Sequence, residues 1–277
     1  MTDAPIVDCH AHVFERDLPF AADAWMAPDY DYTPHDYLAA LDANGVHFGV
    51  LSGLSISGYY NDYTIAAARL SPRLRATAIV APDTDPYTLR RMRDDGVVGL
   101  RFQLVRRPQL PDFTDVAYRL LLRRVRDLDW HVHVAIEGTR LPPVLAALEM
   151  SGVRIVLDHF AHPSPDAGVE CAGYRAALDA VQRGRAWIKL SGGFRLAGPD
   201  AWREPDIAPS EAIAATVAAD LLSRAGPERL LWGSDAPFVG YEGRMTYAHA
   251  LAHLRSWAPD PAMRRALSDT ALRFYFA

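Results

Sequence analysis

The sequence has little cysteine, little net charge and no long apolar run. Its two cysteines, Cys9 and Cys171, lie far apart in the chain, which excludes a disulfide scaffold and makes a reducing cytoplasm the expected location. The formal net charge of −5 leaves no basic surface for nucleic acid or an anionic membrane. No segment has the pattern of a secretory signal or is apolar for long enough to cross a bilayer. The composition is that of an ordinary soluble globular protein.

The chain instead shows a regular alternation of two patterns. Short β-rich runs alternate with stretches whose apolar residues recur at helical spacing. The predicted strands are Ile6–Val13, Val46–Ser52, Leu74–Val80, Val97–Phe102, His131–Ile136, Arg154–Asp158, Ala186–Leu190 and Leu230–Trp232. The predicted helices are Pro34–Asn44, Asp62–Leu70, Pro86–Asp94, Asp115–Leu128, Leu141–Met150, Tyr174–Arg183 and Glu211–Arg224. Several end near a glycine that can close a helix, namely Gly45, Gly96, Gly152, Gly184 and Gly226.

This alternation predicts a parallel sheet with helical crossovers. Eight such units in 277 residues fit a (β/α)8 TIM barrel of the α/β class, and residues 1–277 are expected to form a single domain. A doubly wound sheet is the alternative, but it should carry a glycine-rich turn after the first strand, where this chain has His10-Ala-His-Val-Phe14. Residues 15–33, 160–173 and 194–210 would form enlarged loops over the face where barrel sites are built.

The first predicted strand carries two histidines on one face. Successive side chains of a strand point to opposite faces, so His10 and His12 would aim two imidazoles at one point. Cys9 would point away from them as a small buried residue. Because the surrounding residues are apolar, the pair is expected beside a metal or a polarised substrate oxygen in an interior or a cleft.

Polar groups also stand at the ends of the later strands, where barrel side chains converge. They are Arg101, His131, His133, Glu137, His159, His162, Lys189, Arg195 and Asp235. Each has a purely structural alternative: His159 as a core histidine, Asp235 as a helix cap, and the arginines as salt-bridge partners. Their equivalent positions in repeated units favour a shared site instead. The pair His10-x-His12 combined with Gly-Ser-Asp235 is the most informative part of this set.

Short motifs along nearly the whole chain give a family resemblance. They are Asp8-Cys-His-Ala-His-Val-Phe14, Tyr32-Thr-Pro34, Gly99-Leu-Arg-Phe102, Asp158-His-Phe160, Lys189-Leu-Ser-Gly192 and Leu231-Trp-Gly-Ser-Asp235. In this order they resemble the amidohydrolase superfamily, in the branch that contains 2-pyrone-4,6-dicarboxylate lactonase and sugar-acid lactonases. The resemblance implies a distorted (β/α)8 barrel that hydrolyses a lactone or related ester of a small carboxylated molecule.

Lactone hydrolysis suggests a role for each central residue. Asp235 would take a proton from water and return it to the leaving alkoxide. His10, His12 and His159 would stabilise the oxyanion. In the resembled lactonases the histidines polarise the carbonyl without a required metal, so no cofactor is expected.

A single divalent ion, zinc or manganese, is the alternative to direct polarisation. It would be bound by His10, His12 and Asp235, with His133 or His159 completing the shell. A second ion is not expected, because the fourth strand ends in a cationic arginine rather than a bridging lysine or carboxylate.

Arginines indicate the substrate class. Arg101 and Arg195 favour a carboxylated substrate, because guanidinium groups bind carboxylates through two parallel hydrogen bonds. By resemblance, Tyr32, Ser55 and Ser57 also reach the ligand.

One substrate-binding candidate departs from the family. His162 stands where the pyrone dicarboxylate lactonases carry an arginine, so a monocarboxylated or sugar-derived lactone is as good a candidate as the pyrone. Decarboxylation, lactone isomerisation and a non-enzymatic metabolite-binding barrel are further alternatives. Asp235 favours catalysis, since a pure binder needs no base facing an anionic ligand. Homo-oligomerisation is left open.

Overall fold

The computed structural model describes residues 5–277. Its strands are β1 (Ile6–Ala11), β2 (Val46–Leu51), β3 (Leu74–Ala78), β4 (Val97–Gln103), β5 (His131–Ala135), β6 (Arg154–Leu157), β7 (Ala186–Leu190) and β8 (Leu230–Trp232). Its helices are α1 (Pro34–Ala43), α2 (Asp62–Arg69), α3 (Pro86–Asp94), α4 (Val116–Asp127), α5 (Leu141–Ser151), α6 (Ala172–Gln182), α7 (Ala208–Arg224), α8 (Tyr247–Trp257) and α9 (Pro261–Tyr275).

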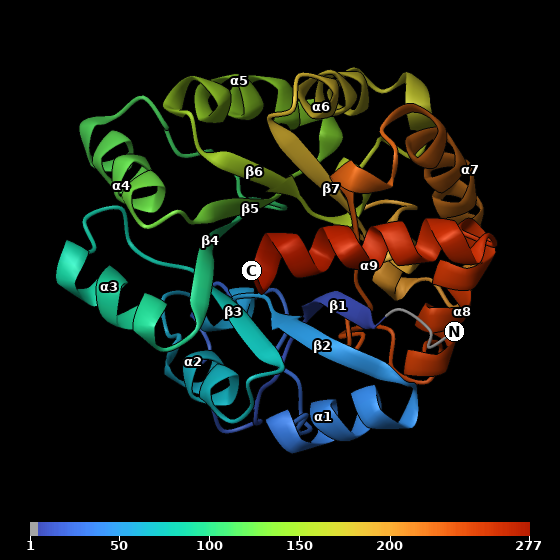
Figure 1. Cartoon of the computed structure of the whole chain (residues 1–277), viewed down its shortest axis with the longest axis horizontal. Helices are drawn as coiled ribbons and strands as arrows, with labels where there is room; N and C mark the ends of the chain where they lie inside the picture. Colours follow the sequence, from blue (N-terminus) through green and yellow to red (C-terminus); the bar gives the residue numbers. More distant parts are fainter. Residues whose placement is uncertain (1–4) are drawn as a thin grey trace.

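The strands form one parallel sheet in chain order from β1 to β8, with helices around the outside (Figure 1). Because β8 is short, closure against β1 depends on backbone bonds beyond its end. The N–H of Asp235 donates to the carbonyl of His10 at 2.7 Å, and the N–H of His12 donates to the carbonyl of Ala236 at 2.8 Å. The predicted α/β class and (β/α)8 barrel are confirmed, and the doubly wound sheet is excluded.

Local sequence explains many helix ends. Thr33 begins α1 through a reciprocal capping box with Asp36, and all five predicted closing glycines adopt positive φ. The periodicity predicts no helix after residue 224, but the structure has two: α8 follows the cap Thr246 and α9 follows the cap Asp260. These start signals are present in the sequence, but they follow the last strand and so fall outside the alternating pattern. No helix within residues 5–277 is long and apolar enough to span a bilayer.

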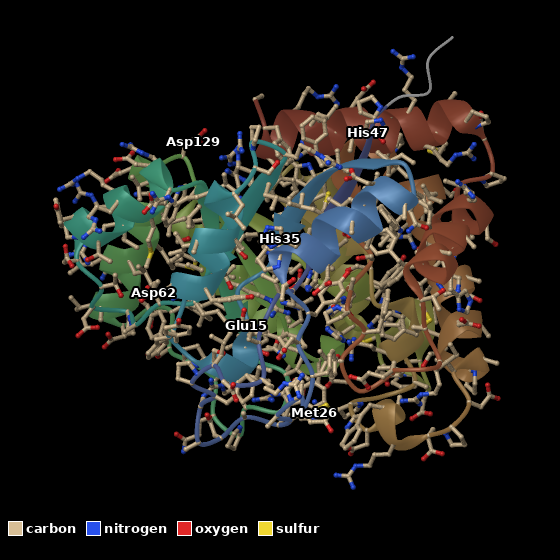
Figure 2. All side chains as sticks on the ribbon, turned by 90° about the horizontal axis from the view of Figure 1, so that it is seen from below. Glu15, Met26, His35, His47, Asp62 and Asp129 are labelled. Carbon is tan, nitrogen blue, oxygen red and sulfur yellow. The ribbon has the colours of Figure 1, made fainter. Side chains whose placement is uncertain are left out.

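Helix α9 covers one end of the barrel. It runs across the barrel in Figure 1, and its Tyr275 and Phe276 pack with Val7 and Val50 in the interior. Figure 2 shows Met26, in the loop after β1, far from the end where α9 lies. The α9 end is therefore closed by packing, and the carboxyl ends of the strands are left for a site.

Strand β1 contains an irregularity that matters for the site. Its pairing with β2 shifts register between Asp8 and Ala11, which is the effect of a β-bulge. Cys9 packs with Val156 and Leu231 inside the barrel, the side that His10 also faces. Cys9 is buried, as predicted, but the prediction that it points away from His10 is wrong because the bulge interrupts the alternation.

Candidate active site

A cavity of about 260 Å³ opens at the carboxyl ends of the strands. Its wall includes the predicted site residues His12, Ser55, Arg101, His159, His162, Arg195 and Asp235. The fold therefore brings together side chains from six strand ends and the loops that follow them. Barrel enzymes build their active sites at this face.

At the floor of the cavity, two imidazoles meet a carboxylate. The Nε2 atoms of His10 and His12 lie 3.2 Å apart. Oδ1 of Asp235 lies 3.6 Å from the first and 3.7 Å from the second. His10 is completely buried just below the cavity wall, whereas His12 and Asp235 contribute to that wall. The spatial convergence predicted for the first and last strands is present.

The partners of the outer nitrogens determine which ring nitrogens carry protons. Nδ1 of His12 lies 2.9 Å from the carbonyl of Ser52, which can only accept, so Nδ1 carries the proton and Nε2 is an acceptor. Nδ1 of His10 lies 3.1 Å from Nζ of Lys189, and an ammonium can only donate. His10 therefore carries its proton on Nε2 and donates it to His12. The result is a one-directional hydrogen-bond chain from Lys189 through both imidazoles to Ser52.

Lys189 is the central group below the cavity. Besides His10, its Nζ lies 3.0 Å from Nδ1 of His133 and 3.2 Å from Oδ1 of Asp158. An ammonium has three N–H bonds, and three acceptors surround this one. Burial lowers the pKa of Lys189, while the charge of Asp158 opposes that shift and favours the ammonium. His10 and His133 are thus both held with the proton on Nε2.

The composition of the chain also indicates that Lys189 is unusual, independently of the strand-end motifs. Lys189 is the only lysine in a chain with 28 arginines, and its side chain is completely buried. Lysine is among the residues least often buried unless it is paired. A single lysine within a predicted interior strand therefore indicates a buried ammonium that is paired with acceptors.

Asp158 completes the charged group beneath the floor. Its Oδ2 lies 3.2 Å from Nε of Arg101, whose Nη1 donates to the carbonyl of Gly53 at 2.9 Å. Burial tends to raise the pKa of Asp158, but the charges of Lys189 and Arg101 hold it well below its usual value. The carboxylate therefore stays ionised and fixes Arg101 against the cavity wall.

Arg195 holds the other oxygen of Asp235. Its Nε lies 2.5 Å from Oδ2, and its Nη1 donates to the carbonyl of Val239 at 3.0 Å. The guanidinium lies 4.8 Å from the ring centres of both Phe194 and Tyr241. Asp235 thus presents Oδ1 to the imidazoles while Oδ2 is clamped.

His159 reaches the cavity through an unusual turn. Residues 159 to 162 all have positive φ, between 43° and 62°, and Asp235 has φ 64°. Left-handed conformations of non-glycine residues cost about 1–2 kcal/mol each and cluster at functional sites. Nδ1 of His159 lies 2.9 Å from Oγ of Ser191, and a Cβ at Gly192 would approach that nitrogen to 2.5 Å. Glycine at 192 is therefore required for this imidazole to occupy its place.

The imidazoles of the cavity wall are neutral near pH 7. Burial, then the charge of Arg101, lowers the pKa of His12 to about 3. Burial lowers the pKa of His159 to about 3 against the opposing charge of Asp158. Burial, then the neighbouring His159, lowers the pKa of His162 to about 3. Neutral imidazoles act as hydrogen-bond groups of fixed direction rather than as cations.

Asp8 joins the first and last strands, a role that its place in the first motif does not predict. It is completely buried and accepts from the N–H and the hydroxyl of Ser234 at 2.8 and 2.6 Å, and from the hydroxyl of Tyr247 at 2.8 Å. Ser234 directly precedes Asp235. The contact fixes Asp235 relative to the His10 backbone.

Four predicted residues lie outside this arrangement, and one of them, His131, packs its ring against Phe274 of α9. His133 sits one layer deeper, where its Nε2 is 3.1 Å from the hydroxyl of Tyr275, and it does not join the donor group of His10, His12 and Asp235. Tyr32 pairs through its backbone with Phe14 and does not line the cavity. Ser57 is buried and also lies off the cavity wall, unlike its neighbour Ser55. Strand-end position alone could not separate these depths.

The enlarged loops add a wall that motif reading does not reveal. Trp25 comes from the loop after β1 and Trp202 from the loop after β7, and their rings meet edge-on at 6.0 Å over the cavity. Gln103 and Arg106, from the end of β4, line the same space. Within residues 5–277 the buried Oε1 of Gln103 has no hydrogen-bond partner, so it is available as an acceptor for a ligand.

Comparisons with known proteins identify the family of this chain. Residues 7–277 match the family described as Amidohydrolase. A 4-sulfomuconolactone hydrolase of Rhizobium radiobacter is 29% identical over 97% of this chain and 89% of the relative. A 2-pyrone-4,6-dicarboxylate hydrolase of Comamonas testosteroni is 28% identical over 99% of this chain and 90% of the relative. A solved structure described as a 2-pyrone-4,6-dicarboxylic acid hydrolase from Pseudomonas putida superposes with a TM-score of 0.88 at 33% identity, covering 99% of this chain and 98% of that one.

Proposed function

Because this chain belongs to the amidohydrolase family, we propose that it hydrolyses a small lactone that carries an anionic group. The curated relatives are lactone hydrolases. One observation carries the proposal for this chain: Oδ1 of Asp235 stands within 3.7 Å of a donating and an accepting imidazole nitrogen at the floor of a cavity flanked by arginines.

Substrate binding begins with an exchange of hydrogen bonds. In the structure the Nε2–H of His10 donates a hydrogen bond to His12. When the lactone binds, its carbonyl oxygen accepts that hydrogen bond in place of His12. The freed Nε2 of His12 and Oδ1 of Asp235, 3.7 Å apart, then both accept from one water at about 2.8 Å each. Water and carbonyl are thereby held next to each other by groups that already face the right way.

The chemical steps need only protein groups and water. Asp235 takes one proton from the water while the water oxygen attacks the carbonyl carbon. His10 and His159 donate to the oxyanion of the tetrahedral intermediate. The ring C–O bond then breaks, and Asp235 returns the proton to the departing alkoxide. One lactone and one water give one hydroxy acid, and the carboxylate of Asp235 is restored.

The charge of the cavity supports an anionic substrate. Arg101 and Arg195 each use Nε and Nη1 on protein partners, and within residues 5–277 neither Nη2 has a hydrogen-bond partner. Each guanidinium can therefore offer one N–H to a carboxylate or sulfonate while remaining anchored. His162 is neutral, so the wall supplies no third cation at that point. These features favour one anionic group near the two arginines.

The same contacts do not fit a metal on His10, His12 and Asp235. An ion would need a lone pair on both Nε2 atoms, but the contact of Lys189 with Nδ1 of His10 places a proton on Nε2 of that ring. Three cationic side chains, Lys189, Arg101 and Arg195, also surround the group and would repel an ion. We therefore propose that hydrolysis requires no metal.

A panel of lactones tests the proposal. Hydrolysis releases one acid per turnover, which a pH indicator follows directly. We expect turnover of lactones bearing a carboxylate or sulfonate, little turnover of the matching methyl esters of the carboxylates, and unchanged rates after exhaustive chelation. A protein that hydrolyses none of these compounds would contradict the function. Loss of activity on chelation that zinc or manganese restores would contradict only the metal-free chemistry.

A further inference from the structure

A second group of metal-ligand side chains lies outside the barrel. His249 and His253 stand one turn apart on α8, and Glu211 stands in the first turn of α7. Residues i and i+4 of a helix share a face, so both imidazoles point toward the neighbouring helix. Figure 1 shows α7 and α8 next to each other at the edge of the barrel.

The spacing of the three donor atoms matches a common ion. Oε1 of Glu211 lies 3.2 Å from Nε2 of His249 and 3.0 Å from Nε2 of His253. All three atoms lie within 4.8 Å of one another. Ligands held at about 2.0–2.1 Å in a tetrahedral zinc site are separated by about 3.3–3.4 Å. The two distances from Glu211 to the imidazoles therefore need to widen only slightly for an ion to be bound between the three side chains.

The charge around this group differs from that at the cavity floor. In the described part of the chain, Glu211 makes ion pairs only with the two histidines, and no arginine or lysine competes for it. Two neutral imidazoles and one carboxylate are the donor set that zinc takes in His2Glu sites.

The group is also open to solvent. The side chains of Glu211, His249 and His253 are 28%, 39% and 14% exposed. An ion can enter without unfolding, and water can fill a fourth position. We infer that Glu211, His249 and His253 form a binding site for zinc or a similar divalent ion, which joins α7 to α8 and is separate from the catalytic cavity.

The position of the site suggests a stabilising role. The ring of His253 stacks on Trp257 at 5.2 Å, and Trp257 packs edge-on against Phe160, the neighbour of His159. Binding at this site would fix α8 to α7 beneath the turn that presents His159. An ion that binds only the folded state raises its stability by mass action.

Zinc titration of the full chain tests the inference. After chelator treatment and desalting, calorimetry with zinc chloride alone should show one ion per chain. His249→Gln and Glu211→Gln should each weaken binding at least tenfold and leave lactone turnover unchanged. His35→Gln, on the surface of α1 (labelled in Figure 2), and His12→Asn, in the catalytic cavity, should leave zinc affinity unchanged.

Thermal unfolding gives an independent measurement. At zinc concentrations about 100-fold above the dissociation constant, the melting temperature of the wild type should rise by about 5–10 °C, and that of His249→Gln should not change. Wild-type affinity no greater than that of Glu211→Gln would overturn the site. So would affinity that is lost in His12→Asn and kept in His249→Gln, because the ion would then sit in the catalytic cavity.

Discussion

Replacing Lys189 with methionine should remove the proton arrangement on which the proposed mechanism depends. The ammonium of Lys189 donates to His10 and His133 and pairs with Asp158 in the barrel interior. Methionine keeps an unbranched side chain, one atom shorter than that of lysine, and cannot donate a hydrogen bond. Nδ1 of His10 would then carry the proton and donate to Oδ1 of Asp158, 3.3 Å away, leaving Nε2 without a proton to give the substrate carbonyl.

The structure sets the size of both effects. Breaking a buried ion pair by removing one partner costs about 3–5 kcal/mol, and Asp158 keeps Arg101 as a partner, so about 3 kcal/mol is expected here. That corresponds to a fall in melting temperature of about 6–12 °C for a chain of this size. Loss of one oriented donor to the oxyanion lowers kcat about 10²–10³-fold. The variant should therefore remain folded at the assay temperature while its kcat falls strongly.

Nitrogen NMR of labelled histidine and lysine separates the two effects. In the wild type, His10 should carry its proton on Nε2, and in Lys189→Met on Nδ1. Because Lys189 is the only lysine, lysine labelling should give a single side-chain signal, that of a buried ammonium. Cys9→Ala is the matched control: it removes a buried neighbour in the same interior, and both the tautomer and kcat should be kept.

The reasoning would be refuted by either of two results. One is a Lys189→Met protein, folded at the assay temperature, with kcat within threefold of the wild type. The other is an unchanged proton position on His10 in that variant, since the chain of hydrogen bonds would then have another origin.

Three further changes test other parts of the site. Asp235→Asn should lower turnover about 10²–10⁴-fold with an unchanged circular dichroism spectrum, because the base is lost while the shape is kept; near-normal rates would assign the base elsewhere. Arg101→Met should raise KM for anionic lactones and also lower the melting temperature, because Arg101 pairs with a buried carboxylate; an unchanged KM would remove it from substrate binding. For pH, the folded-state pKa of His12, His159 and His162 is about 3 and the unfolded value is 6.5, so the unfolded chain binds more protons between these values. Stability in urea unfolding should be constant above pH 6.5 and should fall below it by up to about 1.4 kcal/mol per pH unit for each histidine; a flat profile from pH 7 to 5 would show that these imidazoles are not buried in neutral form.

Sequence patterns alone are enough to predict the repeating part of this protein. Alternating periodicity and closing glycines predicted the strands and most helices, because apolar spacing and backbone conformation are local properties. The strand-end rule also placed His12, His159, Arg195 and Asp235 around one cavity, since parallel strands carry their carboxyl ends to the same face.

The depth of each side chain and the direction of its hydrogen bonds depend on tertiary contacts. His10 and His133 each belong to a His-x-His pair. His133 nevertheless lies a layer below the cavity, whereas His10 lies at its floor. The bulge in β1 turns Cys9 inward, and a single lysine from β7 sets the proton positions of rings on β1 and β5. These outcomes depend on contacts between residues 56 to 179 positions apart, which local patterns do not encode because they arise only when the barrel closes.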